Sequence, residues 1–151
     1  MQDEYLDDTP GARKDLFRRL IELYALGDVD ALRPLVAADY VGHTAAGDRD
    51  WAEFRQSILN FHQIFEYAPD SFIVEDQFVE GDKVATRMTA HVRSRETGEA
   101  MTMIGINLAV IRGGQIREEW NTWEMVGSPA KDGEGAADNA SLSVRGASTS
   151  G

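Results

Sequence analysis

The side chains with the greatest capacity for chemistry gather in residues 113–125, Gly-Gly-Gln-Ile-Arg-Glu-Glu-Trp-Asn-Thr-Trp-Glu-Met. The glycine pair interrupts two runs rich in apolar and β-branched residues, which predicts a hairpin turn followed by a strand. Alternation along that strand places Glu119, Asn121 and Trp123 on one face, together with Arg117. Because a carboxylate and a carboxamide are costly to bury without partners, this face indicates a polar patch inside a pocket. The alternative is that the glutamates are solvated and the tryptophans belong to the core.

Proton transfer is the chemistry that such a patch can perform. Burial raises the pKa of a carboxyl group toward the range in which an acid or base works near neutral pH. Glu119 is the candidate for this role. Asn121 can hold a carbonyl or enolate oxygen without titrating. His91 lies in the middle of a predicted strand and is a candidate for ligand contact. The three histidines are far apart in sequence and lack the spacing of metal ligands, so neither a metal nor a cofactor is predicted.

The composition restricts the class of protein that carries these residues. At 151 residues the chain has the size of one domain. Its net charge of -11 argues against nucleic acid and anionic membrane as partners, because both require a basic surface. The absence of cysteine excludes disulfides, thiolate nucleophiles and cysteine-based metal sites. The acidic N-terminus does not resemble a signal peptide and no apolar run is long enough to span a membrane, so a cytoplasmic location is expected.

Three helices are predicted ahead of the strands. Thr9 and the proline after it supply a cap and a first turn for a helix that Gly27 ends. Asp28 can cap a second, short helix, which Pro34 makes irregular or limits to a turn or two.

An extended segment, residues 39–44, then leads into a loop at Gly47. Asp50 and Glu53 have the spacing of a capping box, which places the start of the third helix there. A stripe of apolar residues along this helix predicts that it packs on a curved sheet.

After Pro69 the apolar period changes to two, which predicts four strands at residues 71–79, 83–95, 99–112 and 115–126. Short connections between sequential strands indicate an antiparallel meander, and helices ahead of a meander give an α+β fold. We therefore expect one domain over residues 13–128, preceded by an N-terminal arm, 1–12. Residues 129–151 are rich in Gly, Ala, Ser and Asp, which predicts a disordered tail.

Aromatic and methionine side chains of these elements are candidates for the walls of the pocket. Taken singly, such residues are more typical of a core. Taken together, they suit a flat, polycyclic or aromatic ligand. The predicted substrate-binding residues are Tyr40, Trp51, Phe54, Phe61, Phe65, His91, Met103 and Trp123.

Four short motifs in this order resemble the SnoaL-like polyketide cyclase family of the nuclear transport factor 2-like superfamily: GDVDAL at 27–32, DYVGH at 39–43, GDKVA at 81–85 and GQIREEW at 114–120. The resemblance implies a cone-shaped α+β barrel. In it a strongly bent, mainly antiparallel sheet wraps around three N-terminal helices and leaves an internal pocket. It also implies a homodimer formed through the outer face of the sheet.

The resemblance also implies which residues occupy the active site, and two of those residues differ in this chain. The cyclases place a catalytic acid/base aspartate directly after the tryptophan of the Glu-x-Trp motif, where this chain has Asn121. They place a histidine on the preceding strand, where this chain has Asn107. An amide does not exchange a proton near neutral pH, so both differences count against an ordinary cyclase. His43 matches a histidine that many members carry after an aspartate-tyrosine pair.

We read the chain as a cofactor-independent enzyme of polyketide-type secondary metabolism, such as antibiotic biosynthesis. It would cyclise or isomerise an apolar, carbonyl-bearing substrate, as a lyase or isomerase does. The predicted catalytic residues are Glu119 and His43, which move the proton, and Asn107 and Asn121, which hold oxygens. The alternatives are a non-catalytic homodimer that binds a ligand or partner, and an enzyme similar to epoxide hydrolases.

One geometric condition decides whether these residues share a cavity. Asn107 and Asn121 face the same side only if the connection at Gly113-Gly114 has an odd number of loop residues, as in a three-residue turn with a bulge. A two-residue turn is expected to place them on opposite faces of the sheet.

Overall fold

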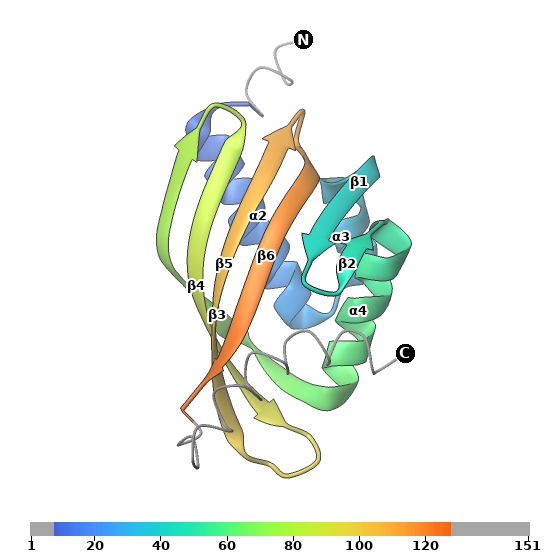
Figure 1. The fold of residues 1–151 in the computed structure, drawn as a ribbon, viewed down its shortest axis with the longest axis vertical. Coiled ribbons are helices and arrows are strands. Elements are labelled where there is room, and N and C mark those ends of the chain that lie inside the picture. Colours follow the sequence, from blue (N-terminus) through green and yellow to red (C-terminus); the bar gives the residue numbers. More distant parts are fainter. Residues whose placement is uncertain (1–7, 128–151) are drawn as a thin grey trace.

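The computed structural model describes residues 8–127 of the chain. In Figure 1 a curved sheet lies over one long helix, with the shorter helices beside one edge of the sheet. The predicted tail, 129–151, lies outside the described residues, as do residues 1–7 of the predicted arm. Within residues 8–127 the helices are α2 Pro10–Leu26, α3 Val29–Leu32, the 3-10 helix η1 Arg33–Leu35, and α4 Trp51–Ile64.

Six strands form one sheet in the order β2-β1-β6-β5-β4-β3. The last four form the predicted antiparallel meander, and β1 joins its far side by running parallel to β6. Strands β2 and β3 are the two edges, so the curved sheet is open rather than closed. The predicted α+β fold is confirmed. The strands are β1 Val36–Thr44, β2 Gly47–Arg49, β3 Phe65–Glu80, β4 Lys83–Ser94, β5 Ala100–Arg112 and β6 Gln115–Val126.

Local signals set the helix ends where the sequence places them. The Thr9 hydroxyl accepts a hydrogen bond from the Ala12 backbone N–H at 3.1 Å, and Gly27 ends α2 with φ of 70°. The capping box of Asp50 and Glu53 is present at the start of α4. Helices α2 and α4 turn apolar residues toward the inner face of the sheet, where the core includes Phe17, Leu20, Ile21, Phe54 and Ile58.

Two strand boundaries differ from the sequence expectation. The segment at Gly47 is a short strand, β2, which pairs with the end of β1 rather than forming a loop. Three residues are too few to show an alternating pattern. Strand β3 begins at Phe65, before Pro69, because proline is tolerated on an edge strand and the pairing with β4 shifts between Tyr67 and Phe72.

A bulge in β6 determines which side chains face the interior. The connection between β5 and β6 has only two residues, Gly113 and Gly114, both with positive φ. The register shifts after Ile111↔Ile116, so that Arg117 is an extra residue and Asn107 lies directly opposite Asn121.

The expectation based on turn length alone was therefore wrong. The turn has two residues, yet the bulge returns Asn107 and Asn121 to one face. Arg117 was also predicted to share the face of Glu119, and this too was wrong. Its Nη1 atom lies 3.8 Å from Asp39, a residue whose side chain is exposed.

Gly105, in the middle of β5, has a packing role. It pairs with Trp123 in an unbroken part of the β5–β6 register. A Cβ atom at this position would lie 2.5 Å from Cε3 of the indole. The glycine therefore leaves room for Trp123 to lie across β5 on the inner face of the sheet.

Candidate active site

A pocket of about 210 Å³ opens between the inner face of the sheet and helices α2 and α4. This volume is below the roughly 300–1,000 Å³ common for ligand pockets, which favours a small ligand or one that extends through the mouth. The turn between β1 and β2 forms part of the wall. Much of the remaining wall is apolar and includes Phe17, Phe54, Phe61, Phe72, Met88 and Met103.

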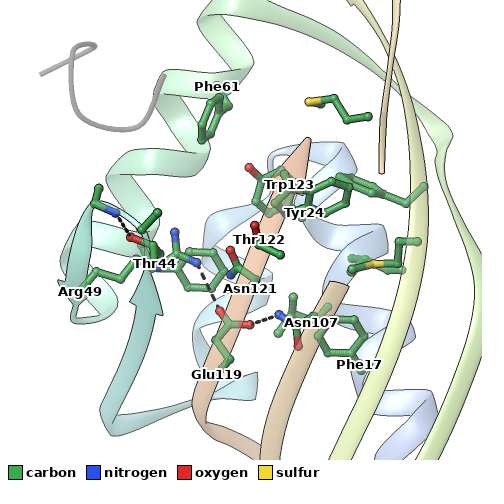
Figure 2. A pocket seen from close by; sticks show the side chains of 18 of the residues that line it. Phe17, Tyr24, Thr44, Arg49, Phe61, Asn107, Glu119, Asn121, Thr122 and Trp123 are labelled. Atoms are coloured by element: carbon green, nitrogen blue, oxygen red, sulfur yellow. Dashed lines mark hydrogen bonds and ion pairs between the residues drawn. The ribbon is translucent and has the colours of Figure 1, made fainter. Parts of the chain in front are cut away.

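Glu119 lies on this pocket and is 2% exposed. Its Oε1 atom accepts a hydrogen bond from the Tyr40 hydroxyl at 2.5 Å and lies 3.3 Å from Nη2 of Arg49. Its Oε2 atom accepts from the Asn107 amide at 2.8 Å. Figure 2 shows Asn107 and Arg49 reaching the carboxylate from different strands. Three donors on one buried carboxyl group indicate that it is held as the carboxylate.

The donors come from three strands that the fold brings together. Tyr40 lies on β1, Arg49 on β2 and Asn107 on β5, while Glu119 itself lies on β6. Gly42 makes this approach possible, since a Cβ atom there would lie 2.4 Å from the Tyr40 hydroxyl oxygen and 2.9 Å from Nε of Arg49.

The electrostatics fix the charges of this group. Burial lowers the pKa of Arg49, but the neighbouring Tyr40 and Glu119 outweigh burial and raise it overall, so the guanidinium stays charged. Burial and the charge of Glu119 raise the pKa of Tyr40 far above its usual value, so Tyr40 is a neutral hydrogen-bond donor. The Arg49 guanidinium also lies 4.3 Å from the centre of the Phe54 ring.

Two amide groups on the pocket have unused hydrogen-bonding capacity. The Oδ1 atom of Asn107 is buried and has no partner among residues 8–127. Asn121 lines the pocket, and no hydrogen bond of its side chain to another described residue is found. An ionised carboxylate offers about four acceptor positions, and the three donors leave one of them open on Oε2 of Glu119. The site can therefore accept a proton and hold an oxygen.

The structure brings most of the sequence-predicted residues to this pocket. Glu119, Asn107 and Asn121 line it together with Phe54, Phe61, Met103 and Trp123. Tyr40 does not line the pocket, but its hydroxyl donates a hydrogen bond to Glu119.

Four predicted residues lie elsewhere. Trp51 packs edge-on against Phe54. Phe65 is buried beside Phe61, outside the set of lining residues. His91 is exposed and lies 3.1 Å from Thr102.

His43 also lies outside the pocket, in an ion-paired cluster. Its Nδ1 atom lies 2.7 Å from Asp48 and its Nε2 atom lies 2.6 Å from Glu118. Because carboxylates only accept, both ring nitrogens carry a proton. The ring also stacks on Trp120. His43 therefore links β1, β2 and β6 next to Arg49, and the structure does not place it where it would move a substrate proton.

The stability that His43 provides should depend on pH. Its hydrogen bonds to Glu118 and Asp48 raise the pKa of His43 above its ordinary value of about 6.5. A group with a raised folded-state pKa contributes fully below its unfolded-state pKa and loses that contribution as pH rises through the folded-state pKa. Urea titrations measure the free energy of unfolding of wild type and His43→Gln. The wild type should be more stable than the variant at pH 6, and this difference should shrink toward alkaline pH. A difference that is constant with pH contradicts the ion-paired cluster.

Replacement of Gly42 should disturb the donors of Glu119. In Gly42→Ala the added methyl group overlaps Tyr40 and Arg49, and overpacking of this kind costs about 1–3 kcal/mol. The matched control is Gly11→Ala in α2, where a Cβ atom has no neighbour within 4 Å and a small gain in stability is expected. Urea unfolding measures both. Equal stability of Gly42→Ala and wild type would show that this close approach does not exist.

Sequence reasoning missed Arg49 as a member of the site. Its strand is too short to be recognised, so nothing predicted which way the side chain points. The pair Tyr40 and Gly42 could have indicated it. The two residues share one face of a strand, and the glycine leaves space on that face for a further side chain beside the aromatic ring. It also missed two tyrosines of the wall, Tyr24 and Tyr67.

Within residues 8–127, no group of three or more histidine, aspartate or glutamate side chains is arranged to hold a metal ion. Among the helices of the same residues, none combines the length and apolar character needed to cross a membrane.

The sequence profile of the SnoaL-like polyketide cyclase family matches residues 14–130. No curated protein matches the chain significantly. Among solved structures, IdmH from Streptomyces antibioticus is 26% identical, with a TM-score of 0.64, over 84% of this chain and 96% of its own.

Two more distant structures share the fold. A SnoaL-like polyketide cyclase from Agrobacterium tumefaciens is 12% identical, with a TM-score of 0.62, over 74% of this chain and 91% of its own. PrhC from Penicillium brasilianum is 13% identical, with a TM-score of 0.67, over 91% of this chain and 94% of its own.

Proposed function

This chain belongs to the SnoaL-like polyketide cyclase family, and on that premise we propose that it is a cofactor-independent enzyme that cyclises or isomerises an apolar carbonyl compound by proton transfer. The observation that carries the proposal is Glu119, a buried carboxylate that lines an apolar pocket and keeps an acceptor position open. The proposal places the reaction in polyketide-type secondary metabolism, such as antibiotic biosynthesis. The proposal also locates the enzyme in the cytoplasm. This compartment is reducing, and a chain without cysteine does not depend on disulfides.

The proposed reaction begins with Glu119 as general base. Its Oε2 atom takes a proton from the carbon beside the substrate carbonyl, and the electron pair of that C–H bond forms an enolate. The Asn121 amide donates to the enolate oxygen. In a cyclisation, the enolate carbon attacks a second carbonyl of the same molecule, and the resulting alkoxide takes the proton back from Glu119. In an isomerisation, the proton returns to a different carbon. Neither route consumes a cofactor.

This arrangement accounts for the asparagine at position 121. In the cyclases that this chain resembles, the acid/base aspartate occupies the position of Asn121. Here the carboxylate belongs to Glu119, the preceding residue of β6 that faces the pocket. Glu119 has one more methylene than aspartate, which extends its reach toward the pocket. The amide at 121 then remains free to bind oxygen. The rival function is a binding protein without turnover, which the loss of the usual aspartate favours.

Hydrogen–deuterium exchange of a simple ketone separates the two functions. We choose 2-tetralone, a flat bicyclic ketone with acidic hydrogens at C1, and follow its exchange in D₂O by proton NMR. An enzyme with a positioned base should accelerate exchange about 10²- to 10⁴-fold over buffer. If 2-tetralone binds, as judged by calorimetry, but exchanges at the rate seen in buffer, the protein is a binder and the proposal fails.

A homodimer through the outer face of the sheet is part of the proposal. Large apolar side chains are exposed on this face, on β3, β5 and β6, and several exposed apolar residues on one face are typical of an interface. They include Ile73 at 43%, Phe78 at 66%, Ile104 at 46%, Ile106 at 58% and Trp120 at 39% exposure.

Introducing a charge at Ile106 should therefore dissociate the dimer. Native mass spectrometry and size-exclusion chromatography of Ile106→Glu should show a monomer where wild type is a dimer, since an unpaired buried charge opposes association. The control is Ala52→Glu, which adds the same charge in the exposed first turn of α4, where acidic residues are tolerated. A wild-type monomer, or an Ile106→Glu dimer of undiminished affinity, contradicts this interface.

A further inference from the structure

The pocket contains a second polar group that the proposed chemistry does not use. Tyr24 of α2 and Tyr67 of β3 both line the pocket, and their hydroxyl groups interact with each other. Beyond this mutual contact, neither hydroxyl has a hydrogen-bond partner within residues 8–127. Each tyrosine hydroxyl offers one donor and acceptor capacity. The pair therefore retains a donor and acceptors for a molecule in the pocket.

The surrounding residues hold both rings in place. His62 donates from Nε2 to the Tyr24 backbone carbonyl at 2.7 Å, and its ring stacks on Tyr67 at 4.4 Å between centroids. Phe72 lies edge-to-face with Tyr24 and stacked on Tyr67. Two hydroxyls fixed in this way lose little freedom when they bind a ligand, so they are suited to recognition.

Both tyrosines are uncharged at physiological pH. Burial raises the pKa of Tyr24 to about 12, and burial raises that of Tyr67 far above the usual value. Neutral hydroxyls in an apolar wall favour a neutral oxygen function, such as a phenol, an alcohol or a ketone, over a carboxylate.

The register separates this pair from Glu119 along the strands. Glu119 pairs with Ala109 of β5, which in turn pairs with Val84 of β4. Tyr67 pairs with Val92, which lies further along β4. Trp123 lies on a row between them. The Phe72 ring contacts both Tyr24 and Trp123, with ring centroids 5.5 and 5.8 Å apart. A ligand that touches both polar groups must extend along this apolar wall.

We propose that the Tyr24–Tyr67 pair binds a second oxygen function of the substrate, so that the substrate class is a flat, elongated, apolar compound with a ketone at Glu119 and a phenol, alcohol or second carbonyl at the tyrosines. This assignment of substrate class rests on the proposed function. It makes Tyr24 and Tyr67 determinants of specificity, because a site built to bond an oxygen discriminates against an analogue that lacks it.

Matched ketones test the assignment. The probes are 4-phenylbutan-2-one and its 3-hydroxyphenyl and 4-hydroxyphenyl analogues, and calorimetry gives each dissociation constant. For wild type we expect at least one phenol to bind about 3- to 10-fold more tightly than the parent, the gain expected of one hydrogen bond. In Tyr24→Phe/Tyr67→Phe this preference should fall to within twofold, while the parent ketone keeps its affinity, which shows that the pocket is intact.

Glu119→Gln is the matched control, because it alters the other polar group and should retain the preference for the phenol. The proposal is overturned if neither phenol binds more tightly than the parent to wild type, or if the preference persists in the double tyrosine variant. Exchange of 2-tetralone by the wild type reports on the proposed function separately, because this ketone has no second oxygen function to contact the tyrosines. A phenol preference without any exchange would refute the proton-transfer chemistry and leave the tyrosine site standing.

Discussion

Glu119→Gln should abolish protein-catalysed exchange of 2-tetralone while the ketone binds with an affinity within a few fold of wild type. A carboxamide has nearly the shape of a carboxylate and still accepts from Tyr40, but it does not take a proton near neutral pH. A positioned base contributes about 10²- to 10⁴-fold, so the exchange rate should fall toward that of buffer. Proton NMR measures the exchange, and calorimetry measures the binding.

The neighbouring residue supplies a matched control. Glu118 differs from Glu119 only in facing outward, where it pairs with His43. Glu118→Gln should therefore keep the exchange rate near that of wild type. Loss of exchange in both variants would point to a disturbed sheet rather than a missing base. Undiminished exchange in Glu119→Gln would remove Glu119 from the mechanism.

Arg49→Met should cause the largest loss of stability among single changes at the site. Its guanidinium is the only cation that contacts Glu119 within residues 8–127, and its side chain is 16% exposed. Removing one partner of a buried pair leaves an uncompensated charge and costs roughly 3–5 kcal/mol. We expect about 3 kcal/mol, the lower end of that range, because Tyr40 and Asn107 still donate to the carboxylate. Urea unfolding should show a lower midpoint with an unchanged slope.

Arg55→Met provides the comparison for this loss. Arg55 lies on the exposed surface of α4 in the same part of the chain, and no interaction of its side chain with another described residue is found. Its replacement should change stability by about 0.5 kcal/mol or less. Equal effects of the two substitutions would mean that the Arg49–Glu119 pair contributes nothing to the fold.

Features set by neighbouring residues were predictable from the sequence. The Thr9 cap, the Asp50–Glu53 capping box and the left-handed Gly27 each depend on residues within one turn of each other, and all three are present. The meander followed from period-two runs separated by glycine turns. The shared face of Glu119, Asn121 and Trp123 followed from alternation, since the bulge lies before this segment.

Features set by contacts between distant segments were not predictable. The bulge at Arg117 leaves no local signature, yet it decides that Asn107 and Asn121 face each other. Two partners of Glu119, Tyr40 and Arg49, lie 79 and 70 residues away in the sequence. The parallel pairing of β1 with β6 and the antiparallel pairing of β2 with β1 bring them close. His43 carried the signature of a catalytic residue, but its strand turns it toward Glu118 and Asp48.

The stereochemistry of exchange tests the central claim most directly, since one fixed carboxylate reaches a bound ketone from one side. The two hydrogens at C1 of 2-tetralone are equivalent in solution but distinct in a pocket where Glu119 Oε2 lies on a single face. Chiral analysis of the monodeuterated product, at times short relative to exchange in buffer, should show a large excess of one enantiomer in wild type and none with Glu119→Gln. A racemic product from wild type would contradict proton removal by a positioned Glu119.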